Sequence, residues 1–272
     1  MKQNFNALLN ELFTVETIMT PTATLFTWPV EAGGNTLWTR PETAGYDLIP
    51  ATRAGEISGL WRKGVETPAP LSHEWFISHN TAVPHVLRLF ATKDSPGFLA
   101  LYGQTIVGLV TPADLNKLPV RAYLYNLIGG LEVGLGRLLR DHFHGDIEGL
   151  LALLSPGSRG TVEAELAETK SGNVDVDPVE FLYISDLIDV VSKEATLRQM
   201  LGYPSRSQIE DDLGGIVSLR NRIMHPVRPF LENVPEDLAQ QHGRIERARI
   251  LLRKLDGLGP TRNRQGTTRL DN

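Results

Sequence analysis

Residues 98–110 read Phe98-Leu-Ala-Leu-Tyr-Gly-Gln-Thr-Ile-Val-Gly-Leu-Val110, which is two short apolar runs joined through a glycine. This pattern predicts a β-hairpin, because short apolar runs fit strands and glycine permits a tight connection. A similar stretch runs from Tyr46 to Trp61, and its second apolar run carries Gly59 where the later one carries Gly108. Two such hairpins predict a duplicated unit, whose copies stack and bury faces that one copy leaves exposed.

Helical segments flank the second hairpin. Apolar residues recur at helical spacing between Ala82 and Ala91, and Pro112 opens a second short helix that reaches Leu118. The order strand, helix, strand, strand, helix indicates an α/β domain in residues 14–119. Residues 1–13 are expected to form an N-terminal helix ahead of it.

The pattern is helical throughout after Pro119. We expect helices at Arg121 to Phe143, Asp146 to Leu154, Pro178 to Leu201, Ser205 to Met224 and Glu236 to Leu255. Residues 155–177 are expected to form a loop and residues 259–272 a flexible tail, because these stretches are polar and lack helical periodicity. The predicted fold class is α+β overall, with an N-terminal α/β domain followed by a C-terminal all-α helical bundle in residues 120–258.

Composition narrows the function classes. The chain has 272 residues, 41% of them hydrophobic, and no cysteine, which excludes disulfide frameworks, thiol nucleophiles and iron–sulfur clusters. No signal peptide or apolar run of membrane-spanning length is recognisable, so we expect a soluble, cytoplasmic protein without a membrane partner.

The net charge of −5 hides an uneven distribution. Residues 121–213 hold 8 Lys and Arg against 16 Asp and Glu, whereas residues 214–272 hold 11 against 6. A local basic strip can bind a phosphate chain even on an acidic protein, because charge interactions are screened within a Debye length of about 8 Å. Solvated helix faces give the same pattern, so charge alone does not distinguish the two readings.

The most informative motif is Leu219-Arg-Asn-Arg-Ile-Met-His-Pro226. Asn221 and His225 are four residues apart and share a helix face, and Arg220 is long enough to reach the same side. Pro226 disfavours helical dihedrals at His225, so the helix should end there. An Arg that binds a phosphate oxygen beside a His that moves protons fits RNA cleavage by the RNA's own 2′-hydroxyl, which needs no metal. The alternative is a histidine that only caps the helix end.

This Arg-Asn-x-x-x-His motif near the end of a late helix, within residues 121–258, resembles the HEPN family. The resemblance implies a helical bundle that forms a homodimer, in which two motifs face each other as a metal-independent endoribonuclease. It also implies that Arg220 stabilises the phosphate, His225 is the acid or base, and Asn221 orients the substrate or His225. Arg222 and Arg228 would contact RNA. Asp186 or Asp189 would be the polar or acidic residue that many members carry on an earlier helix, although either one also fits an ordinary solvated residue of a helix face.

Residues 14–118 resemble a CBS-domain pair, most clearly in Gly108-Leu-Val-Thr-Pro-Ala-Asp114. The resemblance implies that Asp114 binds the ribose hydroxyls and Thr111 a phosphate of an adenine nucleotide. The same two residues also form an ordinary helix cap, so both readings stay open. Gly59-Leu-Trp-Arg-Lys-Gly64 lacks the Thr and the Asp, so at most one of the two nucleotide sites is expected to be intact.

Three functions follow from these expectations. The first is an endoribonuclease that needs no cofactor for catalysis and is regulated by an adenine nucleotide. The second is a non-catalytic module that binds a nucleotide or RNA. The third is a toxin that an inhibitory partner protein restrains.

Overall fold

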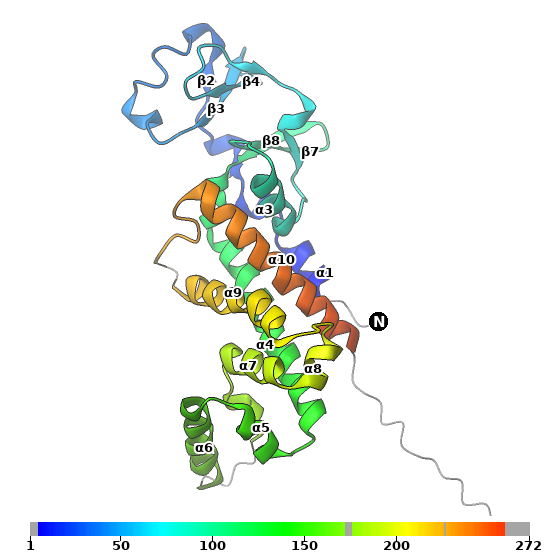
Figure 1. Cartoon of the computed structure of the whole chain (residues 1–272). Helices are drawn as coiled ribbons and strands as arrows, with labels where there is room; N and C mark the ends of the chain where they lie inside the picture. The colour runs from blue at the N-terminus through cyan, green and yellow to red at the C-terminus, as the bar shows by residue number, and fades with distance from the viewer. Residues whose placement is uncertain (1–4, 172–175, 226, 259–272) are drawn as a thin grey trace, which may run out of the picture. The chain divides into compact units, whose positions relative to one another are not determined.

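The computed structural model describes residues 5–171, 176–225 and 227–258, and the expected tail at 259–272 lies outside these residues. Sheets occupy the N-terminal half and helices the C-terminal half, so the predicted mixed α+β class is confirmed (Figure 1). Within the described residues the chain forms two compact units. We call them the α/β unit, residues 7–124 and 225–243, and the helical unit, residues 5–6, 125–224 and 244–258.

The α/β unit contains two four-stranded sheets. The strands are β1 (Thr20–Pro21), β2 (Trp28–Pro29), β3 (Leu48–Arg53), β4 (Glu56–Arg62), β5 (Ala69–Pro70), β6 (Phe76–Ser78), β7 (Phe98–Tyr102) and β8 (Thr105–Val110). One sheet has the order β2-β3-β4-β5 and the other has the order β1-β8-β7-β6. Each therefore has an antiparallel hairpin at its centre, β3–β4 or β7–β8, and one short strand on either side.

The two hairpins confirm the predicted duplication in detail. In each, the turn holds a glycine with positive φ, Gly55 at 85° and Gly103 at 60°. In each, the second strand of the hairpin carries a glycine against which the adjacent strand of the same sheet packs closely. A Cβ atom at Gly59 would lie 2.6 Å from the Ala69 carbonyl oxygen, and one at Gly108 would lie 2.8 Å from that of Thr20. Only glycine leaves room for these neighbouring strands.

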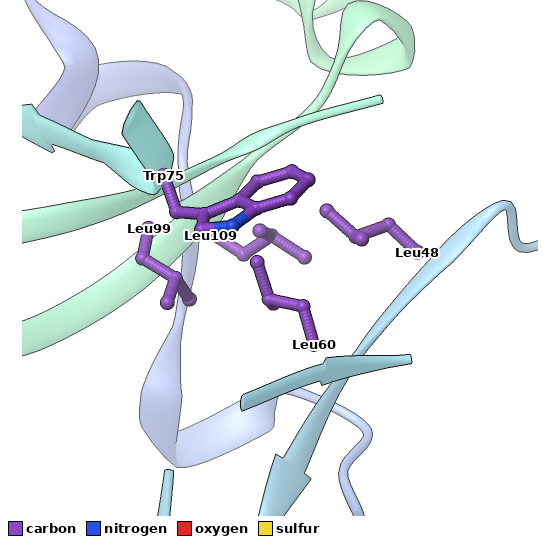
Figure 2. Packing of buried hydrophobic residues seen from close by; sticks show 5 residues of the cluster. All are labelled: Leu48, Leu60, Trp75, Leu99 and Leu109. Atoms are coloured by element: carbon purple, nitrogen blue, oxygen red, sulfur yellow. The ribbon is translucent and has the colours of Figure 1, made fainter. Parts of the chain in front are cut away.

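The core between the sheets is built from both repeats. Leu48 and Leu60 come from the first hairpin, Leu99 and Leu109 from the second, and all four are at most 5% exposed. Figure 2 shows these side chains and Trp75 pointing toward one another. Each buried leucine contributes about 2 kcal/mol from apolar burial, so stacking the copies stabilises both.

Short helices complete the α/β unit. They are α1 (Phe5–Leu12), which starts in the helical unit, α2 (Val15–Ile18), α3 (Val83–Thr92), and the 3₁₀ turns Thr22–Thr24, Val30–Ala32, Pro41–Thr43, His73–Trp75 and Pro112–Asn116. The helix expected at Ala82–Ala91 is α3, and the one expected in residues 1–13 is present as α1, with residues 1–4 outside the described part of the chain. The helix opened by Pro112 is a 3₁₀ turn.

The remaining helices belong wholly or mainly to the helical unit. They are α4 (Leu118–Phe143), α5 (Ile147–Leu153), α6 (Pro156–Ser171), the 3₁₀ turn Pro178–Phe181, α7 (Ile184–Lys193), α8 (Ala195–Met200), α9 (Arg206–Met224) and α10 (Val234–Leu258). Both α4 and α10 begin in the α/β unit and continue into the helical unit. No helix in the described ranges is both long and apolar enough to cross a membrane.

Two helix expectations were wrong. Residues 156–171 form α6 instead of a loop, because Ser155 accepts a hydrogen bond from the Ser158 amide at 3.2 Å and Val162 and Leu166 bury one face. The single helix expected from Pro178 to Leu201 is divided into a 3₁₀ turn, α7 and α8. Asp186 and Glu194 accept hydrogen bonds from backbone amides where the new helices begin.

Candidate functional site

A hollow of about 880 Å³ opens in the α/β unit. Thr111 and Asp114 both line it, so the two residues expected to bind a nucleotide lie at one site. Tyr46 and Arg62 come from the first repeat and line the same hollow. We call it the α/β hollow.

Asp114 is held firmly at the α/β hollow. Its Oδ2 accepts hydrogen bonds from the Thr111 amide at 2.6 Å and the Thr111 hydroxyl at 2.9 Å. Its Oδ1 lies 2.7 Å from Lys117 Nζ, which also donates to the Ile18 carbonyl at 2.6 Å. The helix-capping arrangement is therefore present, in residues that also form the wall of a hollow.

Arg62 is a residue that the sequence analysis missed. It ends β4 in the first repeat, and its guanidinium carbon lies 5.8 Å from the centre of the Trp75 ring. An arginine that lines a hollow can pair with a phosphate. Arg62 lies in Gly59-Leu-Trp-Arg-Lys-Gly64, the segment whose lack of the Thr and the Asp argued against a second nucleotide site.

Arg220 lies at two hollows of the helical unit. The larger has a volume of about 500 Å³ and is walled by α4, α6 and the segment before α7; we call it the helical hollow. The smaller, of about 120 Å³, is lined by Tyr125, Met224 and other residues of α4 and α9. Glu132 on α4 lines both hollows together with Arg220.

Glu132 is the acidic residue that the structure brings to Arg220. Burial raises the pKa of the Glu132 carboxyl, and the positive charge of Arg220 opposes that rise. Arg220 Nη1 also donates to Asn221 Oδ1 at 3.4 Å. Arg220 and Asn221 thus lie together, with a half-buried carboxyl nearby that the sequence pattern did not reveal.

His225, the last residue of the Arg-Asn-x-x-x-His motif, follows directly after the end of α9. α9 stops at Met224, as predicted, and the division between the two units falls between Met224 and His225. His225 is exposed, and its carbonyl accepts hydrogen bonds from the Arg228 amide at 3.1 Å and from Arg121 Nη1 at 3.5 Å. The Arg121 guanidinium also donates to the Arg228 carbonyl.

Arg121 and Asn116 fasten the segment that follows His225. Arg121 is only 7% exposed, and burial lowers the pKa of its guanidinium. Asn116 donates to the Leu231 carbonyl at 3.2 Å and accepts from the Leu231 amide at 2.7 Å. Neither residue stood out in the sequence, because the residues they contact lie more than 100 positions away.

The remaining candidates have the following surroundings. Asp186 accepts hydrogen bonds from the Tyr183 amide and from the Ser158 hydroxyl, and Asp189 pairs with Lys193 at 2.6 Å. Both aspartates therefore have structural partners, which agrees with their reading as ordinary helix-face residues. Arg222 is half-buried in the last turn of α9 and Arg228 is exposed, and their contacts with RNA stay predictions.

Comparison with known protein families finds none that matches the chain, and no curated protein matches it either. Among solved structures, one similar chain is the CBS domain of a bacterial CNNM/CorC family Mg²⁺ transporter in complex with ATP. It is 18% identical, with a TM-score of 0.31, and the match covers 41% of this chain and 92% of that one.

Proposed function

We propose that the protein is a metal-independent endoribonuclease whose α/β unit binds an adenine nucleotide that regulates cleavage. The observation that carries the proposal is the position of Arg220, which lines two hollows with a half-buried carboxyl and contacts Asn221. A cation held at an open hollow is available to bind a phosphate of RNA.

The reaction needs two proton transfers. The ribose 2′-oxygen attacks phosphorus and loses its proton to a base, while the bond from phosphorus to the 5′-oxygen breaks and an acid protonates that oxygen. The products are a 2′,3′-cyclic phosphate and a free 5′-hydroxyl. His225 serves as one of the two proton-transfer groups. Arg220 stabilises the negative charge that builds on the phosphate oxygens.

A second copy of the chain would supply the other histidine. Exposed apolar side chains surround Arg220 on α4 and α9: Tyr125 is 57% exposed, Val133 62% and Met224 45%. Apolar side chains grouped on one surface favour a protein contact. We propose a homodimer in which this surface is covered.

The α/β hollow is the proposed nucleotide site. Asp114 would accept hydrogen bonds from ribose hydroxyls, and Thr111 and Arg62 would bind phosphate. The similar CBS domain was solved in complex with ATP, so ATP is the first ligand to test.

Regulation has a physical route within the α/β unit. Asp114 at the hollow and Asn116 belong to the same 3₁₀ turn. The Asn116 side chain forms hydrogen bonds with both the amide and the carbonyl of Leu231. Arg121 holds the carbonyl of His225. A ligand that shifts this turn would shift the segment that carries His225, provided that it binds the two arrangements with different affinity.

The test is to incubate purified protein with total RNA in EDTA, with and without ATP or AMP, and to analyse the ends of the products. Cleavage by the wild type that leaves cyclic phosphate ends, is lost in His225→Ala and changes with nucleotide supports the proposal. Cleavage that persists in His225→Ala would contradict the role of His225.

A second function is a non-catalytic nucleotide-binding module, which the α/β hollow favours. Equilibrium binding of ATP separates the two. Binding that depends on Asp114, in a protein that leaves every RNA intact, would support the module and contradict the ribonuclease.

A further inference from the structure

The helical hollow offers aromatic surface beside Arg220. Tyr183 lines it with 64% of its surface exposed, and Phe181 lines it two residues earlier. Planar rings at an open hollow are the surface on which proteins stack the bases of single-stranded RNA. These rings have no role in the chemistry proposed above.

The backbone of the segment that carries Phe181 and Tyr183 is held by hydrogen bonds at both ends. Asp177 accepts hydrogen bonds from the Val179 amide at 2.8 Å and from Arg140 Nε on α4 at 3.1 Å. The Tyr183 amide donates to Asp186 at 3.1 Å. The backbone is therefore held in place while the Tyr183 ring stays exposed, which lowers the entropic cost of binding a ligand.

The opposite wall supplies hydrogen-bond acceptors. Glu165 on α6 lines the hollow, and its carboxylate has no ion pair or hydrogen bond within residues 5–171, 176–225 and 227–258. A carboxylate only accepts hydrogen bonds, and it has two oxygens. Guanine presents two adjacent donors on one edge, N1–H and N2–H. Uracil presents one donor between two carbonyl oxygens, which a carboxylate repels.

A basic protein side chain is the main alternative ligand. A lysine or arginine side chain of a protein partner would also fit carboxylates and aromatic rings. Arg220 also lines the hollow, has no ion pair within the described residues and would repel such a side chain, whereas Arg140 is already paired with Asp177 and Glu180. A ligand with a neutral, donor-rich ring and an anionic phosphate matches both the carboxylate of Glu165 and the cation of Arg220. The volume of about 500 Å³ suits a ligand of that size.

We infer that the helical hollow is a subsite for a guanine base next to the phosphate that Arg220 binds. Tyr183 stacks on the base, and Glu165 accepts hydrogen bonds from N1–H and N2–H. The inference rests on the proposed function for the place of the base beside the cleaved phosphate, whereas base binding is measured independently of cleavage.

The experiment uses the full-length His225→Ala protein and two fluorescein-labelled hexaribonucleotides, UUGUUU and UUUUUU, with binding followed by fluorescence anisotropy. We expect UUGUUU to bind about tenfold more tightly, within the range that one stacked base contributes. Adding Tyr183→Ala should remove most of that preference, and adding Glu165→Gln should reduce it. The matched control is Tyr102→Ala, which removes a tyrosine of the same 64% exposure on β7 and should leave the preference unchanged. Circular dichroism checks the folding of each variant.

Equal binding of the two hexanucleotides, or a preference that survives both Tyr183→Ala and Glu165→Gln, would overturn the inference. So would tight binding of a tetra-arginine peptide that is lost in Tyr183→Ala, since that result would assign the hollow to a basic protein partner. Cleavage of the same hexanucleotides by the wild type in EDTA tests the ribonuclease separately. Cleavage without guanine preference would overturn only the base subsite, and guanine preference without cleavage would overturn only the ribonuclease.

Discussion

The α/β hollow and the helical hollow each contain a partly or fully buried carboxyl group, and the surroundings of the two groups differ. Asp114 has partners on both oxygens, from Thr111 and Lys117. Glu132 has no hydrogen bond or ion pair within the described part of the chain, and burial raises its pKa. A carboxyl hydrogen-bonded by its neighbours contributes to stability, whereas one whose burial is only partly offset by a nearby cation costs stability and marks a candidate functional site. Asp114 thus stabilises the α/β hollow whose wall it forms, whereas Glu132 is buried in the helical hollow at a cost in stability.

The largest expected effect is the loss of cleavage in Arg220→Ala. Removing a group that stabilises charge in the transition state lowers the cleavage rate by about 100- to 1,000-fold. The free energy of unfolding should change by less than about 1 kcal/mol, because Arg220 forms no ion pair within the described residues. Cleavage assays and urea denaturation measure the two quantities.

The matched control for Arg220 is Arg206→Ala. Arg206 lies in the first turn of the same helix, where it pairs with Glu210 at 2.6 Å. The Arg206→Ala variant should therefore cleave RNA at the wild-type rate. Equal losses in the two variants would show that Arg220 acts only through overall charge.

The Asp114→Ala variant should show the opposite pattern. It removes the cap of the 3₁₀ turn and the ion pair with Lys117, so we expect the free energy of unfolding to fall by about 2 kcal/mol. ATP binding should be lost as well. Asp114→Asn keeps an acceptor for the Thr111 amide and should lose less stability. An unchanged urea midpoint in Asp114→Ala would contradict the structural role.

The smallest expected effect is on the pH dependence of stability, through Glu132. Its pKa is raised above the ordinary 4.5 in the folded protein, so the folded state holds the proton more tightly than the unfolded chain does. The stability associated with this proton is present below pH 4.5 and is lost as the pH rises through the folded pKa. Glu132→Gln should therefore become more stable relative to the wild type as the pH rises. A stability difference that is constant with pH would refute this.

Much of the fold was predictable because it depends on local patterns. The apolar runs and turn glycines gave the two hairpins, and the proline after His225 placed the end of α9 correctly. α6 was missed because its apolar face consists of little more than Val162 and Leu166, too weak a pattern to stand out among polar residues. The boundary between the units also differs from the expected one at residue 119, since residues 225–243 belong to the α/β unit.

The candidate sites were predictable only in part. Thr111 and Asp114 lie three residues apart, and Arg220 and Asn221 are adjacent, so their spacing alone placed each pair on one element. Glu132, Arg121 and Arg62 lie far in sequence from the site residues beside which the fold places them. Patterns in a single sequence do not reveal which distant residues are close in space. The candidates for the family's residue on an earlier helix were Asp186 and Asp189, and both have structural partners.

From residue order alone follow the duplicated hairpins, the helical second half and the two short motifs, because hydrogen bonding, turn geometry and side-chain periodicity act over a few residues. Tertiary structure was needed to show that the hollows exist, that Glu132 lies buried near Arg220, and that Arg121 holds the carbonyl of His225. Burial and electrostatics depend on which distant segments pack together, and that packing is settled by the whole chain.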